Sequence, residues 1–177
     1  RAMIEPSSHT LTASALPPSG QDNDLQTLVH FEPLSVLWLD NLLPIEEQSY
    51  SHPWSRGNFQ DSMNAGYETQ LLVNHKHELL GYFVAMTVLD EVHLLNITVS
   101  PAHQHQGWGK LMLDALALSA RQKNAQWIWL EVRSSNERAR KIYADNGFVE
   151  VGQRKNYYPS TDGPRENTVL MSLKLWH

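Results

Sequence analysis

The sequence predicts a single α+β domain built around a mixed, mostly antiparallel sheet flanked by helices. The chain has 177 residues, 41% of them apolar, and this size favours one domain with a substantial core over two smaller ones. The expected elements run in the order two helices, three strands, then helix, strand, helix and two strands. Such an order, with some strands adjacent and others separated by helices, is typical of an α+β arrangement.

The first segment, residues 1–27, is interpreted as a flexible tail, and the folded domain is expected to span residues 28–177. The tail is rich in Ser, Thr, Pro and Gly and shows no sustained hydrophobic period. The chain lacks an apolar run near the roughly 20 residues of a membrane span, and it lacks the regions of a secretory signal. A cytoplasmic protein is therefore expected. The absence of cysteine excludes disulfides and thiol nucleophiles.

Two helices are expected before the sheet. The pattern over residues 40–50 predicts the first, with Asp40 as its cap and Pro44 near its first turn. Residues 55–64 predict a second, short helix behind the turn SHPW.

Three strands should follow as an antiparallel meander. Their runs are rich in Val, Leu, Tyr, Phe and Thr and occupy residues 69–73, 79–89 and 91–99. The dipeptides that suit tight reversals between them are Asn74-His75 and Leu89-Asp90.

The second half alternates helices with strands. Residues 107–123 predict a helix with Leu111, Ala115 and Leu118 on one face, and residues 136–145 predict a helix that stops at Asn146-Gly147. The remaining predicted strands are residues 127–132, 148–154 and 168–175.

Gly107 and Gly109 stand where the third strand meets the next helix. The N–H groups that begin a helix have no intrahelical partner, and they often bind phosphate. Glycine can adopt the positive φ values that a turn needs when its main-chain N–H groups point together at an anion. A dinucleotide fingerprint does not fit, because Met112 replaces its third glycine, and no P-loop sequence occurs. By themselves the two glycines are also compatible with a plain helix start.

Charge is distributed unevenly along the chain, whose net charge is −5. Residues 1–100 hold 3 Lys and Arg against 12 Asp and Glu, whereas residues 101–177 hold 11 against 7. This asymmetry is compatible with an anionic ligand held by the second half and a cationic one by the first. It is equally compatible with two ordinary solvated faces.

Several segments together give the sequence a family resemblance. They resemble the acetyl-CoA motif and flanking segments of the GNAT acetyltransferase superfamily. The segments are SHPWSR, LLNITV, WLEVRSSN, KIYADNGF and RKNYYPSTDG, together with Gln104-x-x-Gly107-x-Gly109. The resemblance runs from about Leu42 to Leu173. It is greatest to the RimI type, which acetylates the N-terminal alanine of a small-subunit ribosomal protein, and it implies the GNAT fold with a splayed central strand pair. One departure is His105, where these enzymes often carry arginine.

The resemblance implies acetyl-CoA as the co-substrate. The main chain of residues 97–99, at the edge of their strand, would pair with the pantetheine arm. Residues 105–110 would hold the pyrophosphate, and Asn136, at the start of the next helix, would add a contact with CoA. The residues so implied are Ile97, Thr98, Val99, His105, Gln106, Gly107, Trp108, Gly109, Lys110 and Asn136. The nearby cations Arg138, Arg140 and Lys141 would either meet phosphate charge or form a solvated helix face.

The resemblance also implies direct transfer of the acetyl group with two catalytic residues. Glu131 would be the general base, on the same strand face as Trp127 and Trp129, and Tyr143 would be the general acid that protonates the CoA thiolate. The alternatives are an ion pair between Glu131 and Arg133 or another cation at a strand end, and a tyrosine that only packs on the sheet.

Tyr157 and Tyr158 belong to a loop that, by the resemblance, lies over the acceptor. The implied partner is the N-terminus of a small-subunit ribosomal protein, without direct nucleic-acid or membrane contact, and a monomer is expected. A protein or small-amine acetyltransferase of broader specificity and a CoA-binding module without turnover are the alternatives. No metal is expected, because the pairs His75-x-His77 and His103-x-His105 lack a nearby carboxylate set.

Overall fold

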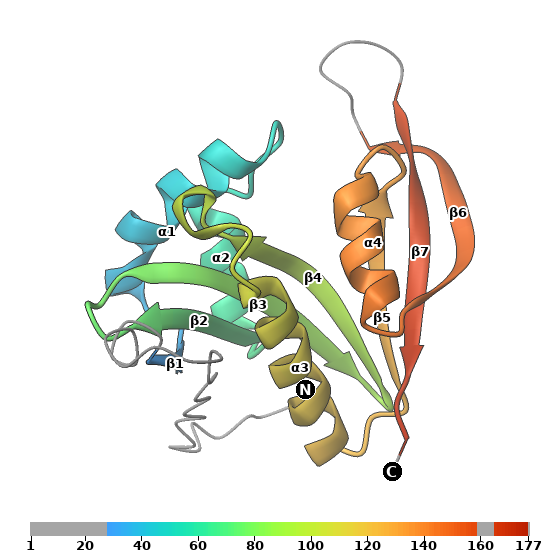
Figure 1. Cartoon of the computed structure of the whole chain (residues 1–177), viewed down its shortest axis with the longest axis horizontal. Helices are drawn as coiled ribbons and strands as arrows, with labels where there is room; N and C mark the ends of the chain where they lie inside the picture. The colour runs from blue at the N-terminus through green and yellow to red at the C-terminus, as the bar shows by residue number, and fades with distance from the viewer. Residues whose placement is uncertain (1–27, 159–164, 177) are drawn as a thin grey trace. The chain divides into compact units, whose positions relative to one another are not determined.

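The computed structural model of the chain describes residues 28–158 and 165–176, apart from the side chains of residues 156–158 (Figure 1). Its elements are β1 (Val29–Pro33), α1 (Val36–Ser49), α2 (Arg56–Asn64), β2 (Glu68–Asn74), β3 (Leu79–Val88), β4 (Glu91–Val99), η1 (Pro101–His103), α3 (Trp108–Gln122), β5 (Trp127–Arg133), α4 (Glu137–Asp145), β6 (Val149–Tyr158) and β7 (Glu166–Lys174). The predicted tail, residues 1–27, lies outside the described residues. Within the described part, no helix is long and apolar enough to cross a membrane.

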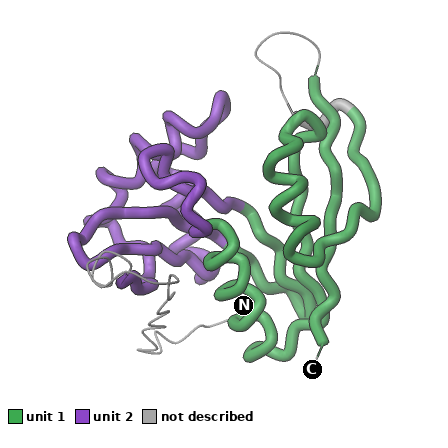
Figure 2. Tube along the Cα trace, in the orientation of Figure 1, with its two compact units in different colours: residues 1, 85–95, 109–177 green, residues 2–84, 96–108 purple. Residues whose placement is uncertain are grey.

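The described residues divide into two compact units (Figure 2). Unit 1 comprises residues 85–95, 109–158 and 165–176, and so holds β5, α4, β6, β7 and nearly all of α3. Unit 2 comprises residues 28–84 and 96–108, and so holds β1, α1, α2, β2 and η1. Strands β3 and β4 contribute to both units.

The seven strands form one mixed sheet in the order β1-β2-β3-β4-β5-β7-β6. Strands β4 and β5 are parallel, and α3 supplies the crossover that a parallel pair requires. Their register pairs only Glu91–His93 with Trp127–Trp129, although β4 continues to Val99 and β5 to Arg133. The predicted mixed sheet with a splayed central pair is therefore confirmed.

Unit 2 has an apolar core between its helices and strands. Phe59 of α2 meets Tyr82 of β3 edge to face, with 5.9 Å between the ring centroids. The buried cluster around this pair consists of Leu34, Trp38, Leu39, Leu42, Phe59, Leu71, Val73, Leu79, Tyr82 and Val84. Because these residues come from α1, α2, β2 and β3, with Leu34 from the segment between β1 and α1, the core holds both helices against the strands.

The predicted start of the first helix was wrong. Helix α1 begins at Val36 with Ser35 as its N-cap, so Asp40 and Pro44 both lie inside it. Pro44 cannot donate a hydrogen bond to the preceding turn, which costs about 3 kcal/mol. Each large apolar side chain that is buried contributes about 1.5–3 kcal/mol. Burial of Trp38, Leu39 and Leu42 therefore outweighs the proline, and Asp40 forms an ion pair with Arg56 of α2 instead of a cap.

Strand β1 was not predicted, although its pattern is present in the sequence. Val29 and Phe31 are buried and alternate with His30 and Glu32, and the strand pairs with β2 in antiparallel register. Five residues ending in Pro33 are too short to separate a strand from the start of a loop by sequence alone.

The two predicted reversals are confirmed. Asn74 Oδ1 accepts the main-chain N–H groups of Lys76 and Glu78 at 3.0 and 2.9 Å, which closes the turn between β2 and β3. Leu89 adopts a positive φ of 54° between β3 and β4, so two residues suffice for that turn.

Candidate active site

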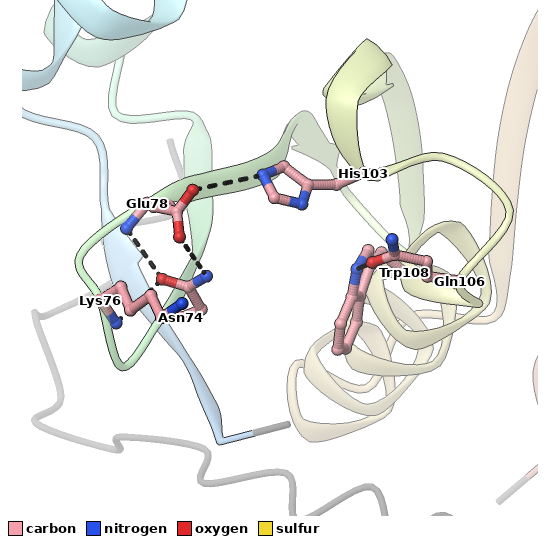
Figure 3. Close-up of polar contacts among 6 residues, drawn as sticks. All are labelled: Asn74, Lys76, Glu78, His103, Gln106 and Trp108. Atoms are coloured by element: carbon pink, nitrogen blue, oxygen red, sulfur yellow. Dashed lines mark hydrogen bonds and ion pairs between the residues drawn. The ribbon is translucent and has the colours of Figure 1, made fainter. Parts of the chain in front are cut away.

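The turn that follows β4 has the backbone expected of an anion-binding loop. His105 and Gly107 have φ values of 63° and 85°, and α3 begins at Trp108, so the first N–H groups of a long helix follow directly. Gly109 lies inside α3 and is not among the residues with positive φ. The Trp108 indole N–H donates to Gln106 Oε1 at 2.9 Å and thereby joins two side chains of the turn (Figure 3).

We expect Gly107→Ala to weaken CoA binding, because alanine strains the backbone at a positive φ and its Cβ would take up the open space beside the amides of the turn. A positive φ costs a residue with a Cβ about 1–2 kcal/mol, whereas a Cβ at Gly107 would meet no heavy atom within 4 Å among the described residues. Calorimetry with CoA measures the loss, expected at about tenfold. Gly152→Ala on β6 is the matched control, because a Cβ there meets equally open space and Gly152 has no positive φ. Equal affinity of the two variants would contradict the prediction.

A buried carboxylate in unit 2 was missed by the sequence analysis. Glu46 of α1 is 1% exposed and accepts hydrogen bonds from the Tyr82 hydroxyl at 2.7 Å, Asn96 Nδ2 at 2.9 Å and the Trp54 N–H at 3.3 Å. Burial raises the pKa of the Glu46 carboxyl above its usual value, and the three donated hydrogen bonds oppose that rise. The available signal was its position four residues after Leu42, on the buried side of the helix.

The same set of contacts extends to the end of β4. Thr98 is 3% exposed and donates to Asn96 Oδ1 at 2.8 Å. The Tyr50 hydroxyl lies 2.7 Å from Thr98 Oγ1 and donates to the Ile97 carbonyl at 2.9 Å. Burial of the hydroxyl raises the pKa of Tyr50 to about 12, so the group keeps its proton well above neutral pH. Two residues predicted to meet the pantetheine arm, Ile97 and Thr98, are thus contacted by Tyr50, the C-cap of α1, and Asn96 links Thr98 to Glu46 of that helix.

Glu131 lies on β5 of unit 1, on the predicted face with Trp127 and Trp129. Burial alternates along the strand, and the two tryptophan rings lie 5.8 Å apart. Glu131 Oε2 accepts the Thr168 hydroxyl at 3.1 Å, and Oε1 lies 3.2 Å from Arg154 Nη2. The ion pair that the sequence left open is therefore present, with Arg154 as the partner in place of Arg133, which pairs with Glu166. The role of Glu131 as a base stays a prediction.

Tyr143 of α4 is held by the motif that ends the helix. The Phe148 N–H donates to the Tyr143 carbonyl and the Gly147 N–H to the Ala144 carbonyl, both at 3.0 Å, and Gly147 has a φ of 92°. This is a Schellman motif, which confirms the predicted stop at Asn146-Gly147. The Tyr143 and Phe148 rings lie 5.8 Å apart, so Tyr143 has a packing contact, and its role as an acid stays a prediction.

The turn from β5 into α4 is fixed by two polar side chains. Asn136 Oδ1 accepts the Ala139 N–H at 3.2 Å and so caps the helix. Glu166 of β7 accepts the Ser135 N–H at 2.7 Å and lies 3.6 Å from Arg133 Nη1. Hydrogen bonds from Ser135, followed by the charge of Arg133, hold the pKa of Glu166 below its usual value. The start of α4, where a further CoA contact is expected, is thus anchored to β7.

Three of the candidate phosphate-binding cations are paired with carboxylates in unit 1. The pairs are Lys110–Asp114 at 2.7 Å, Arg140–Glu150 at 2.6 Å and Lys141–Asp145 at 2.8 Å. In addition to its ion pair, Arg140 donates a hydrogen bond to the Ser134 carbonyl at 2.9 Å. The side chains of these pairs are partly or largely exposed, and such pairs contribute only about 0–1 kcal/mol, so a phosphate could exchange for the carboxylate.

The predicted loop was wrong for Tyr157 and Tyr158, whose main chain forms the last two residues of β6. Their side chains and residues 159–164 lie outside the described residues. Their role in binding the acceptor stays a prediction.

The histidine pairs were the possible metal ligands that the sequence raised. His103 Nε2 lies 3.8 Å from Glu78 Oε2 (Figure 3). Among the side chains that the structure describes, no group of three His, Cys, Asp or Glu could hold a metal ion.

The mixed seven-stranded sheet and comparisons with known proteins identify the chain as an acetyltransferase of the GNAT class. Residues 39–148 match the acetyltransferase (GNAT) family, and the chain belongs to this family. It is 41% identical over 136 residues to ribosomal protein bS18-alanine N-acetyltransferase of Haemophilus influenzae. The aligned residues cover 77% of this chain and 92% of that enzyme. The predicted family and fold are confirmed.

Solved structures agree with this assignment. The crystal structure of the ribosomal-protein-S18-alanine N-acetyltransferase from Escherichia coli matches with a TM-score of 0.77 and 32% identity, over 84% of this chain and 95% of that one. Spermidine N-acetyltransferase from Vibrio cholerae, solved in complex with CoA and spermine, matches with a TM-score of 0.71 over 83% of this chain and 95% of that one. At 16% identity the second likeness shows the fold alone.

Proposed function

We propose that this chain transfers the acetyl group of acetyl-CoA to the N-terminal α-amine of a small-subunit ribosomal protein that begins with alanine. The observation that carries the proposal is the likeness to the Haemophilus influenzae enzyme, which is 41% identical over 136 residues and extends over 92% of that enzyme. Such a substrate would be met in the cytoplasm.

The donor would lie along the end of β4 and over the turn that follows. Main-chain groups of Ile97, Thr98 and Val99 would pair with the amides of the pantetheine arm. The amides from His105 to Lys110 would bind the pyrophosphate, and the open space beside Gly107 leaves room for it. Asn136 would add a contact from the start of α4. His105 replaces the arginine often found at its position, so the backbone amides and Lys110 would supply more of the affinity.

The reaction proposed is a direct attack on the thioester. The amine nitrogen forms a bond to the acetyl carbonyl carbon, the bond from that carbon to the CoA sulfur breaks, and the sulfur leaves as a thiolate. Glu131 would accept the proton that the amine loses, directly or through water, and Tyr143 would protonate the thiolate. An α-amine has an ordinary pKa of about 7.7–8.0 against about 10.4 for lysine, so much more of it is neutral near pH 7. A modest base therefore suffices for an N-terminal acceptor.

Mass spectrometry of an acceptor incubated with the chain and acetyl-CoA tests the proposal. The acceptor is an isolated small-subunit ribosomal protein with a free N-terminal alanine, and the matched control is the same protein with a blocked N-terminus. We expect one acetyl group, located on the N-terminal fragment. Acetylation of internal lysines or of an added polyamine instead would indicate broader specificity. CoA binding without acetylation would indicate a module without turnover.

A further inference from the structure

Two buried polar residues continue the inner face of β4. Burial alternates along the strand, with Val92 and Leu94 buried in its first half and Asn96 and Thr98 buried in its second half, at 8% and 3% exposure. An amide or a hydroxyl that loses water without a hydrogen bond costs free energy, so this half of β4 requires polar partners. The end of the strand is therefore held by directional hydrogen bonds where apolar contacts hold its start.

Glu46 is the centre of these hydrogen bonds. Its carboxylate joins three further segments to α1, through the main chain of Trp54 before α2, Tyr82 of β3 and Asn96 of β4. All three partners donate hydrogen bonds to Glu46. A carboxylate only accepts hydrogen bonds and so satisfies all three donors, whereas an apolar side chain at this position would leave them unpaired. Since networks of this kind specify one geometry, the orientation of Asn96 depends on Glu46.

The effect of Glu46 reaches the main chain of β4. Asn96 accepts the Thr98 hydroxyl, Thr98 contacts the Tyr50 hydroxyl, and Tyr50 donates to the carbonyl of Ile97. Tyr50 is 37% exposed, so the set of contacts runs from a fully buried carboxylate to the surface of unit 2. The contacts in it are 2.7–3.3 Å long, and all but the longest, which the Trp54 N–H donates, lie in the usual range of hydrogen bonds.

We propose that Glu46 is a positioning residue for the acetyl donor, which acts through Asn96, Thr98 and Tyr50 on the main chain of Ile97–Val99. The proposal rests on the proposed function, since it takes the pantetheine arm of CoA as the ligand of β4. Glu46 touches neither the donor nor the acceptor in this assignment. It orders the strand during folding, so that less conformational entropy is lost when CoA binds.

The test compares Glu46→Gln with Glu47→Gln, the next and exposed residue of the same helix. Both substitutions remove one negative charge, but only the first places an NH₂ group among the donors of Tyr82, Asn96 and Trp54. We expect the Kd for CoA and the KM for acetyl-CoA to rise about tenfold in Glu46→Gln, with kcat much less affected. Glu47→Gln should match the wild type. Hydrogen exchange at residues 96–99 should be faster in Glu46→Gln without CoA.

Tyr50→Phe provides a second variant at the exposed end of the network, where loss of a hydroxyl does not endanger the core. It should weaken CoA binding in the same sense. The double variant should show less than the product of the two single effects, because both act through the same strand. Tyr50→Phe combined with Glu47→Gln should behave as Tyr50→Phe alone.

The outcomes separate this inference from the proposed function. A wild-type chain that neither binds CoA nor acetylates the ribosomal protein would overturn the function itself. An active wild type whose Glu46→Gln and Tyr50→Phe variants bind CoA as tightly as Glu47→Gln would overturn only the positioning role. Loss of kcat at unchanged CoA affinity would overturn it as well. If Glu46→Gln does not fold, the CoA affinity of Tyr50→Phe decides the question by itself.

Discussion

Glu131→Gln is expected to lower kcat by about 10²-fold to 10⁴-fold while CoA affinity stays nearly unchanged. Glutamine has the same shape and can still accept the hydrogen bond that Thr168 donates, but it cannot take a proton from the attacking amine. Acetyl transfer to an N-terminal peptide at saturating substrates measures the first quantity, and calorimetry with CoA measures the second. Unchanged turnover would remove Glu131 from the chemistry.

The ion pair with Arg154 offers a control for this result. Arg154→Gln removes the same 3.2 Å contact but leaves the carboxylate in place. If Glu131 only serves the ion pair, the two variants should lose similar amounts of activity and of unfolding free energy. If Glu131 is the base, Arg154→Gln should lose far less turnover than Glu131→Gln.

Tyr143→Phe is expected to lower kcat by about 10²-fold, with smaller changes in acceptor and CoA binding. The substitution removes one hydroxyl and retains the ring that packs on Phe148 at 5.8 Å, so the end of α4 should keep its structure. The proposed acid protonates the leaving thiolate. A donor thioester whose leaving thiol is more acidic needs less of this help and should restore much of the lost rate.

Tyr67→Phe is the matched control for this experiment. It removes the same atom from a partly buried tyrosine that packs against the core of unit 2. A rate for Tyr143→Phe equal to that of Tyr67→Phe, with no benefit from the more acidic leaving group, would leave Tyr143 with a packing role only.

Elements with strong local signals were predictable from the sequence. Strand β4 has the predicted bounds, α3 differs from its predicted range by one residue at each end, and α4 begins after its Asn136 cap and stops before Gly147. Each of these boundaries depends on residues next to one another in the chain, namely a β-branched run, a capping side chain or a glycine.

Elements that depend on distant residues were predicted less well. The start of α1 was placed too late because Pro44 and Asp40 are good local signals for a helix start, yet burial of Trp38 and Leu39 in the core extends the helix toward Val36. The short alternating pattern of β1 does not by itself distinguish a strand from a loop, and its pairing with β2, some 40 residues away in the chain, decides between them. In both cases tertiary packing outweighs local propensity.

By itself the sequence determined the family, the turn that would hold the donor and the two residues proposed for the chemistry, because short motifs place those groups relative to their own strand or helix. Only the tertiary structure decided which side chains those groups meet. Glu46 accepts hydrogen bonds from Tyr82 and Asn96, which lie 36 and 50 positions further along the chain, and Glu131 accepts one from Thr168, which lies 37 positions further. Hydrogen bonds and ion pairs act over a few ångströms in space, so a partner across the sheet leaves no local pattern in the chain.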